Sequence, residues 1–169
     1  MSEAAEEHRR AAPTRLSFSV LTISDSRTLA SDRSGQLLVS EMQRAGHQLL
    51  ERGLVADEPA IIAAEVCRLA DAGQVDVLLL TGGTGIAPRD TTPEAVRPLL
   101  EVELPGFGEL FRWLSYQEIG AATILSRALA GRRGQALIFC LPGSTAAVRL
   151  ALEKILLPEL PHLVHHARG

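Results

Sequence analysis

The sequence predicts one α/β domain in which helices cover both faces of a mostly parallel, mixed sheet, a three-layer α/β/α arrangement. Short apolar runs alternate along the chain with segments whose apolar residues recur at helical spacing. Residues 75–80, VDVLLL, are almost wholly apolar, which is typical of a central strand covered on both faces. Residues 131–134 connect two apolar runs and predict an antiparallel hairpin, so the sheet is expected to be mixed.

The remaining elements can be placed in order from the same patterns. Residues 16–23 combine alternation with a β-branched run and predict the first strand. Residues 34–45 predict a helix, residues 47–55 a weaker strand, and residues 59–72 a second helix that opens on a proline. After the central strand we expect helices at 92–100 and 106–117, hairpin strands at 124–130 and 135–141, and a last helix from the turn at 142–145 to before Pro158.

Length and composition favour one domain with a short tail. The chain has 169 residues, of which 46% are hydrophobic and 22% charged, proportions that suffice for a core without disulfides or metal. Residues 1–14 are polar and Ala-rich with no apolar face, so we expect a disordered tail followed by a single domain at 15–169. Cys67 and Cys140 form no CxxC pair and are expected to be buried thiols.

Charge and hydropathy exclude several partners. A net charge of −3 argues against nucleic acid as a partner, although a local pocket for a small anion stays possible. The sequence has neither the long apolar run that a membrane span needs nor a charged start followed by an apolar run, so a cytoplasmic location is expected.

A glycine-rich loop follows the central strand directly. Gly82, Gly83, Thr84 and Gly85 could turn their amides toward one point at the sheet edge and bind a phosphate. The same residues are explained equally by a tight turn, and neither a Rossmann nor a P-loop pattern is present. Residues 82–85 alone leave both interpretations open.

Two carboxylates stand near this loop in the predicted topology. Asp90 comes shortly after the glycines, and Asp57 follows the second strand, at the same end of a parallel sheet. A carboxylate beside a phosphate site can hold Mg²⁺, because the ion screens the repulsion between the two anions. Each residue has an alternative role as a helix cap, Asp57 for the helix at Pro59 and Asp90 for the helix at Thr92.

Two further loops reach the same edge of the sheet. Ser24 and Asp25 follow the first strand, and Pro142, Gly143 and Ser144 follow the last one. Ser144 can cap a helix, bind an anion at its N-terminus, or do both. Because ligands of this fold class lie beyond the carboxyl ends of the strands, the convergence of four polar loops predicts a ligand site.

Two other clusters are assigned no ligand. His165 and His166 are adjacent, so on a helix they point in different directions, and a solvated tail is the preferred interpretation. Phe111, Trp113 and Tyr116 recur at helical spacing, which favours core or subunit packing over a surface that stacks nucleic-acid bases.

Six segments together resemble one known family. They read ISDSR with DRSG, VADEPAII, LLLTGGTGIAPRDTTPEA, ELPGFGELFRWLSYQEIG, ILSRALAG and LIFCLPGST. In this order and at these spacings they resemble the molybdenum cofactor biosynthesis proteins of the MoaB/Mog type, over nearly the whole chain after the tail. The resemblance implies the molybdopterin-binding fold of that family and a homo-oligomer, a trimer or a hexamer.

The resemblance also implies a reaction. Catalytic members of the family transfer AMP from ATP to the terminal phosphate of molybdopterin with Mg²⁺ and release pyrophosphate. Asp57 and Asp90 match the two acidic positions tied to catalysis and metal binding. The implied substrate-binding set consists of Ser24, Asp25, Gly82, Gly83, Thr84, Gly85, Thr91, Glu94, Ser126, Pro142, Gly143 and Ser144.

Two other functions stay open at this stage. The segments FRWLSYQEIG and PGST resemble the MoaB branch, some members of which lack adenylyl transfer, so a non-catalytic molybdopterin-binding or carrier protein is the main alternative. A third possibility is that only subunit assembly matters. The complete pair of Asp57 and Asp90 favours the adenylyltransferase.

Overall fold

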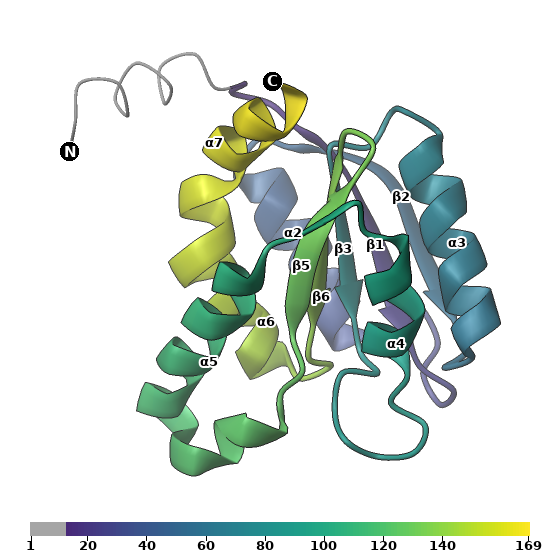
Figure 1. Ribbon diagram of the computed structural model, residues 1–169, viewed down its shortest axis with the longest axis vertical. Coiled ribbons are helices and arrows are strands. Elements are labelled where there is room, and N and C mark those ends of the chain that lie inside the picture. The colour runs from purple at the N-terminus through teal and green to yellow at the C-terminus, as the bar shows by residue number, and fades with distance from the viewer. Residues whose placement is uncertain (1–12) are drawn as a thin grey trace.

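A six-stranded mixed sheet runs through the centre of the molecule (Figure 1). The computed structural model describes residues 13–169. The strands are β1 (Ser17–Ile23), β2 (Gln48–Val55), β3 (Val77–Thr81), β4 (Val102–Glu103), β5 (Leu129–Arg133) and β6 (Ala136–Leu141). Their order is β2-β1-β3-β6-β5-β4; the first four in this order are parallel, and β5 runs antiparallel to both of its neighbours.

Helices cover both faces of this sheet. The helical segments are α2 (Arg33–Arg44), α3 (Pro59–Asp71), α4 (Thr92–Val96), η1 (Arg97–Leu99), α5 (Pro105–Ile119), η2 (Gly120–Leu125), α6 (Thr145–Ala151), η3 (Leu152–Leu156) and α7 (Leu157–Arg168). The segments η1 and η2 are 3₁₀ helices, and η3 is a π-helix. In Figure 1, α3 and α4 lie on one side of the sheet, and α2, α5, α6 and α7 pack on the other. The predicted three-layer α/β/α fold is confirmed.

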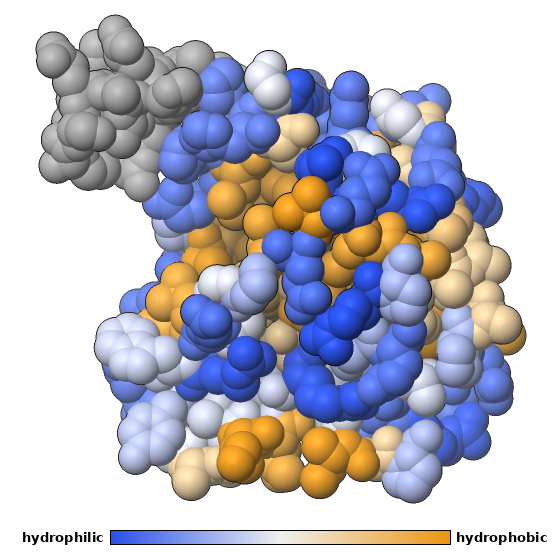
Figure 2. Space-filling model, in the orientation of Figure 1, coloured by the Kyte–Doolittle hydropathy of each residue, from blue (hydrophilic) through white to orange (hydrophobic). Residues whose placement is uncertain are grey.

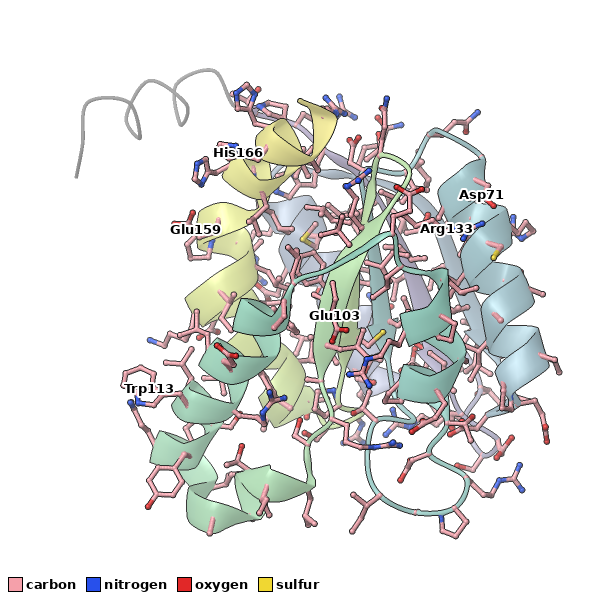
Figure 3. The ribbon with its side chains drawn as sticks, viewed as in Figure 1. Asp71, Glu103, Trp113, Arg133, Glu159 and His166 are labelled. Atoms are coloured by element: carbon pink, nitrogen blue, oxygen red, sulfur yellow. The ribbon has the colours of Figure 1, made fainter. Side chains whose placement is uncertain are left out.

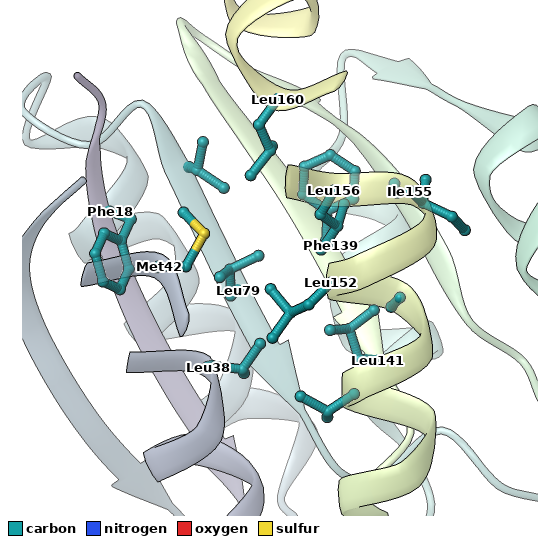
Figure 4. Close-up of a cluster of buried hydrophobic side chains, with 14 of the residues drawn as sticks. Phe18, Leu38, Met42, Leu79, Phe139, Leu141, Leu152, Ile155, Leu156 and Leu160 are labelled. Carbon is teal, nitrogen blue, oxygen red and sulfur yellow. The ribbon is translucent and has the colours of Figure 1, made fainter. Parts of the chain in front are cut away.

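The central strand β3 contributes side chains to two separate hydrophobic cores. Val77 and Leu79 of β3 point into the cluster beneath α2, α5, α6 and α7, part of which Figure 4 shows. Leu78 and Leu80 point into the cluster beneath α3 and α4. All four side chains are fully buried, as expected for a parallel strand covered on both faces. The apolar run that predicted this strand therefore reflects two cores, one on each face.

The predicted strand at 124–130 is wrong at residues 124–128 and ends too early, because β5 spans Leu129–Arg133. Ile124 and Leu125 end η2, and strand pairing begins only where Leu129 faces Cys140. Because β6 ends one residue later, at Leu141, a longer β5 would have no partner strand. The hairpin itself is confirmed, but residues 131–133, predicted as its connection, belong to β5, and the turn is formed by residues 134–135. The edge strand β4 was not predicted because its two residues carry no periodic signal.

The last helix does not stop before Pro158. The chain stays helical from α6 through η3 into α7, with Pro158 in the first turn of α7 and Pro161 inside it. A proline normally breaks a helix because it lacks an N–H and its ring crowds the carbonyl four residues earlier. Here Leu156, Leu160 and Val164 are fully buried against the sheet, and this burial holds the segment helical.

Other predictions are changed by the packing. Cys140 is buried, which raises the pKa of its thiol, whereas Cys67 is only half-buried. Phe111 belongs to the core, but Trp113 and Tyr116 are each 60% exposed. The predicted tail falls almost entirely outside the described residues. Among residues 13–169, no helix is long and apolar enough to cross a membrane.

Candidate functional site

A cleft lies at the carboxyl ends of the parallel strands, at the bottom of Figure 1. It encloses about 580 Å³, a volume typical of small-ligand sites. Loops that follow β1, β2, β3 and β6 form one wall, which we call the loop wall, and α5 with η2 forms the other, the helical wall. The predicted site residues that line the cleft are Ser24, Asp25, Asp57, Gly82, Gly83, Thr84, Gly85, Asp90, Ser126, Pro142, Gly143 and Ser144.

The glycine loop is both a tight turn and part of the cleft. Gly82 has φ +110°, and a Cβ there would lie 2.2 Å from the carbonyl oxygen of Ile23. Gly83 has φ +63°, and its Cβ would lie 2.3 Å from Oγ1 of Thr92. Both positions exclude a side chain, so the turn interpretation is correct and does not compete with ligand binding.

The amides of this loop have different tasks. The Gly82 amide donates to the Leu141 carbonyl at 3.0 Å, so it joins β3 to β6. Within residues 13–169, the amides of Gly83, Thr84 and Gly85 donate to no protein group. Three consecutive amides in a loop that lines the cleft are therefore available to donate to an anion.

Asp57 is held by the loop and does not cap a helix. The N-cap of α3 is Glu58, and no side chain caps that helix. One oxygen of Asp57, Oδ1, accepts hydrogen bonds from the amide of Thr91 at 3.3 Å and from its hydroxyl at 3.0 Å. Its carboxylate lies so close to Gly83 that a Cβ there would be 3.0 Å from Oδ2. The capping alternative for Asp57 is therefore wrong.

Asp90 closes the far end of the same loop. Its Oδ2 accepts a hydrogen bond from the Ala87 amide at 2.8 Å, and a Cβ on Gly85 would lie 2.6 Å from that oxygen. The N-cap of α4 is Thr91, again without a side-chain bond, so Asp90 does not cap α4. The two carboxylates thus pack against two different glycines of one loop.

A third carboxylate, Asp25, completes the acidic part of the cleft. Its Oδ1 accepts a hydrogen bond from the Asp57 amide at 3.1 Å, and its Oδ2 lies 2.6 Å from the Arg89 guanidinium. The loop after β1 is thereby tied to the loop after β2. Ser144 caps α6 by accepting from the Ala147 amide at 3.2 Å, as predicted, and its side chain also lines the cleft.

Thr91 and Glu94 lie outside this cleft. Thr91 donates to Asp57, and Glu94 forms an ion pair with Arg127. Partial burial acts to raise the pKa of the Glu94 carboxyl, but the hydrogen bond from Arg127, the backbone amide of Glu94 and the positive charges of Arg127 and Arg97 together outweigh burial and hold the pKa below its usual value. Both residues support the loop from outside the cleft, and the Glu94 side chain is itself 58% exposed.

Arg127 is a support that the sequence analysis missed. Its Nε donates to the Gly85 carbonyl at 2.7 Å, and its Nη2 donates to the Asp90 carbonyl at 2.5 Å. Its own amide donates to the Thr84 carbonyl at 3.1 Å. Arg127 lies two residues after the end of η2, so it ties the helical wall to the glycine loop. Its place beside Ser126 was the signal that could have found it.

Arg27 is the second missed residue, and it brings a cation to the cleft. Its guanidinium donates to the Gly143 carbonyl at 3.2 Å and to the Ser34 hydroxyl at 2.9 Å, and its side chain stays 37% exposed. It lies two residues after Asp25, in the loop that follows β1. Its position at the carboxyl end of a parallel strand was the signal that could have found it.

A buried carboxylate lies beneath Arg27. Asp32 accepts hydrogen bonds from the Thr22 hydroxyl at 2.7 Å and the Gly35 amide at 2.9 Å, and it pairs with Arg52 at 3.1 Å. Burial acts to raise the pKa of the Asp32 carboxyl, but these hydrogen bonds, that from Thr22 foremost, outweigh burial and hold the pKa below its usual value. Arg27 lies 3.8 Å from this carboxylate.

The helical wall is mostly apolar and partly exposed. It contributes Phe111, Ser115, Ile119, Ala122, Thr123 and Leu125. Figure 2 shows hydrophobic surface at the lower edge of the molecule, below η2 and the loop after β3, where Ile86, Ile124 and Leu125 are 67%, 81% and 50% exposed. The sequence analysis assigned no site residue to α5, because its apolar spacing was explained by packing.

Fold and cleft define a three-layer α/β protein with a polar small-ligand site at the carboxyl edge of its sheet. Residues 19–162 match a family described as a probable molybdopterin binding domain. The chain belongs to this family, the MoaB/Mog family of molybdenum cofactor biosynthesis proteins.

Individual relatives agree with this assignment. The chain is 51% identical over 160 residues, 94% of both chains, to molybdenum cofactor biosynthesis protein B of Halalkalibacterium halodurans. A crystal structure of a molybdenum cofactor biosynthesis protein B is 46% identical with a TM-score of 0.89, covering 93% of this chain and 98% of that one. The tungsten cofactor synthesizing protein MoaB from Pyrococcus furiosus is 39% identical with a TM-score of 0.84, over 94% of this chain and 100% of that one.

Proposed function

We propose that this protein is a molybdopterin adenylyltransferase: it binds molybdopterin and ATP in the cleft and transfers AMP to the terminal phosphate of molybdopterin. A phosphate oxygen of molybdopterin attacks the α-phosphorus of ATP. The bond from that phosphorus to the bridging oxygen breaks, and pyrophosphate leaves with the bond electrons. The observation that carries the proposal is the packing of Asp57 and Asp90 against two glycines of one loop that lines the cleft and has three amides without a protein acceptor in the described part of the chain.

The donor set of the cleft fits Mg²⁺. Asp57 Oδ2 and Asp90 Oδ1 accept no hydrogen bond within residues 13–169, while their partner oxygens are held by loop amides. No group of three or more His, Cys, Asp or Glu side chains in that part of the chain forms a complete metal site. This agrees with the usual binding of Mg²⁺ by one or two carboxylates together with substrate phosphates. Bound there, the ion would neutralise charge on the phosphates.

The chain's own residues have three tasks in this reaction. The amides of Gly83, Thr84 and Gly85 bind phosphate oxygens and stabilise charge that develops on the phosphorus under attack. Arg27 supplies a fixed positive charge from the opposite loop. The helical wall offers apolar surface to a heterocycle and keeps water from that side of the cleft. No residue acts as a nucleophile, since the substrate phosphate does.

Incubation of the purified protein with ATP, Mg²⁺ and molybdopterin tests the proposal. We expect pyrophosphate release that requires all three components. Asp90→Asn should lower turnover about 10²–10³-fold, because the variant loses the carboxylate that would hold Mg²⁺ against the phosphates. Molybdopterin should still bind. The control is Asp71→Asn, which removes a carboxylate that pairs with Arg133 at the opposite end of the sheet (Figure 3). Near-normal turnover of Asp90→Asn would overturn the role of that carboxylate.

A second function is favoured by the branch of the family. Two of the relatives named for this chain are molybdenum cofactor biosynthesis proteins B. The MoaB branch that the sequence resembles includes members without adenylyl transfer. A molybdopterin-binding or carrier protein would use the same cleft. In the assay above it would bind molybdopterin tightly and release no pyrophosphate at any ATP concentration.

We further propose that the chain acts in the cytoplasm as a homo-oligomer, a trimer or a hexamer. The support is an exposed apolar face on α5, where Trp113, Tyr116 and Ile119 are 60%, 60% and 59% exposed, and Figure 3 shows Trp113 pointing away from the core. Sedimentation should give three or six times the chain mass of 18.1 kDa. Trp113→Glu should dissociate the assembly, whereas a monomeric wild-type protein would contradict the proposal.

A further inference from the structure

A histidine cluster lies on α7, at the end of the molecule away from the cleft (Figure 3). His162 Nε2 and His166 Nε2 are 3.0 Å apart, and their rings meet edge to face with centroids 4.6 Å apart. His162 Nδ1 lies 3.2 Å from Oε2 of Glu159. About two turns of helix therefore bring two imidazoles and a carboxylate into a chain of contacts.

The two histidines in hydrogen-bonding contact are not the adjacent pair that stands out in the sequence. His165 and His166 are adjacent, and their ring centroids are 5.8 Å apart. His162 and His166 are four residues apart, so both project from one side of the helix. The helix was expected to end before Pro158, but it continues to Arg168 and so places these two histidines on one side. A solvated tail would not hold them in a fixed relative position.

The separation of the two nitrogens matches a metal bite. Two ligands at about 2.0–2.1 Å from one metal, with an angle of about 90–110° between them, lie about 2.9–3.4 Å apart. The observed 3.0 Å falls in this range. The spacing of the two nitrogens therefore permits both to bind one metal in place of the hydrogen bond between them.

We propose that His162 and His166 bind a divalent transition metal, and that Glu159 orients His162 by accepting a hydrogen bond from Nδ1. A carboxylate on the second nitrogen is the usual support of a metal-binding histidine, because it fixes the tautomer that leaves Nε2 for the metal. Imidazole nitrogens suit Zn²⁺, Co²⁺, Ni²⁺ and Cu²⁺, whereas Mg²⁺ requires oxygen ligands. The site is therefore separate in place and in chemistry from the Mg²⁺ site proposed in the cleft.

The coordination would be open. No third His, Cys, Asp or Glu completes a set within the part of the chain that the structure describes, so water or another ligand fills the remaining positions. His47, another histidine of the described chain, is buried and accepts a hydrogen bond from the Leu16 amide. His47 is therefore not a competing site.

Calorimetric titration of the full chain with NiCl₂, and separately with ZnCl₂, tests this site. We expect one binding event that His162→Ala and His166→Ala each abolish, that His165→Ala leaves intact, and that Glu159→Gln weakens about tenfold. MgCl₂ should give no signal that depends on these histidines. Equal loss of affinity in His165→Ala, or unchanged binding in both His162→Ala and His166→Ala, would overturn the proposal.

Measuring the Tm with and without Ni²⁺ distinguishes loss of the metal site from misfolding of a variant. Ni²⁺ bound by residues four apart cross-links one helical turn, so it should raise the Tm of the wild-type chain and of His165→Ala. His166→Ala should keep its own metal-free Tm when Ni²⁺ is added. A Tm shift in His166→Ala as large as that of the wild type would contradict the assignment, whatever its calorimetric trace.

Discussion

The two walls of the cleft are built in different ways. The loop wall is held by backbone and side-chain hydrogen bonds among Asp25, Asp57 and Thr91, and its glycines at 82, 83 and 85 are packed so closely that an added Cβ would clash. The helical wall presents Ile119 and Leu125, which are 59% and 50% exposed. A rigid polar wall suits charge stabilisation, which requires donors already in place, and an apolar wall suits a heterocycle. Under the proposed function, the loop wall therefore stabilises charge in the reaction, and the helical wall contributes affinity for the substrate.

The rigidity of the loop wall is tested most strongly at Gly82. Gly82→Ala combines a positive φ with a backbone clash at 2.2 Å and should cost more than about 3 kcal/mol of unfolding free energy. Gly46→Ala is the matched control, because its φ of +92° is also positive but no atom lies within 4 Å of the added Cβ. Urea denaturation should therefore give Gly82→Ala a much lower free energy of unfolding than Gly46→Ala. Equal losses would mean that the close approach of the loop to β1 is unimportant.

Acid should weaken the support beneath the loop wall. Since the folded pKa of Asp32 lies below its unfolded value, the ionised carboxylate stabilises the fold above about pH 3.8, and this contribution disappears as the pH falls through the folded pKa. At pH 7, Asp32→Asn should lose about 2 kcal/mol. The stability difference between Asp32→Asn and wild type should shrink as the pH falls below about 3.8 toward the folded pKa of Asp32. A difference that does not depend on pH would show that charge is not the cause.

Arg127 joins the two walls, so its removal should uncouple them. Arg127→Ala should lower turnover about tenfold through a looser Gly85–Asp90 segment, with about 1 kcal/mol lost in stability. Arg127→Lys should recover little, because one ammonium cannot serve two carbonyls and Glu94 with the geometry of a guanidinium. Arg149→Ala, which removes an exposed pair with Glu153, is the control and should leave turnover unchanged.

The loop wall could be predicted from sequence, and the helical wall could not. Glycines and carboxylates after short apolar runs are local signals, and the topology of a parallel sheet brings them to one edge. Whether Asp57 caps a helix or faces a ligand depends on one side-chain direction, which no local pattern determines. The apolar residues of α5 and η2 look alike in sequence whether they fill a core or line a cleft.

The errors in the fold have the same origin. β4 and the true start of β5 depend on where a partner strand ends, and the passage of the last helix through Pro158 and Pro161 depends on buried leucines around them. Both are tertiary effects that override local propensity. The histidine pair on α7 followed from the second of these effects, and for that reason the sequence did not reveal it.

Steady-state kinetics of AMP transfer in two variants test the division between the walls most directly. Asp57→Asn, on the loop wall, should lower kcat at least about 10²-fold and leave the Kd for molybdopterin nearly unchanged. Ile119→Ala, on the helical wall, should raise that Kd about threefold to tenfold and leave kcat nearly unchanged. The reverse pattern, with affinity lost in Asp57→Asn and turnover lost in Ile119→Ala, would contradict the account.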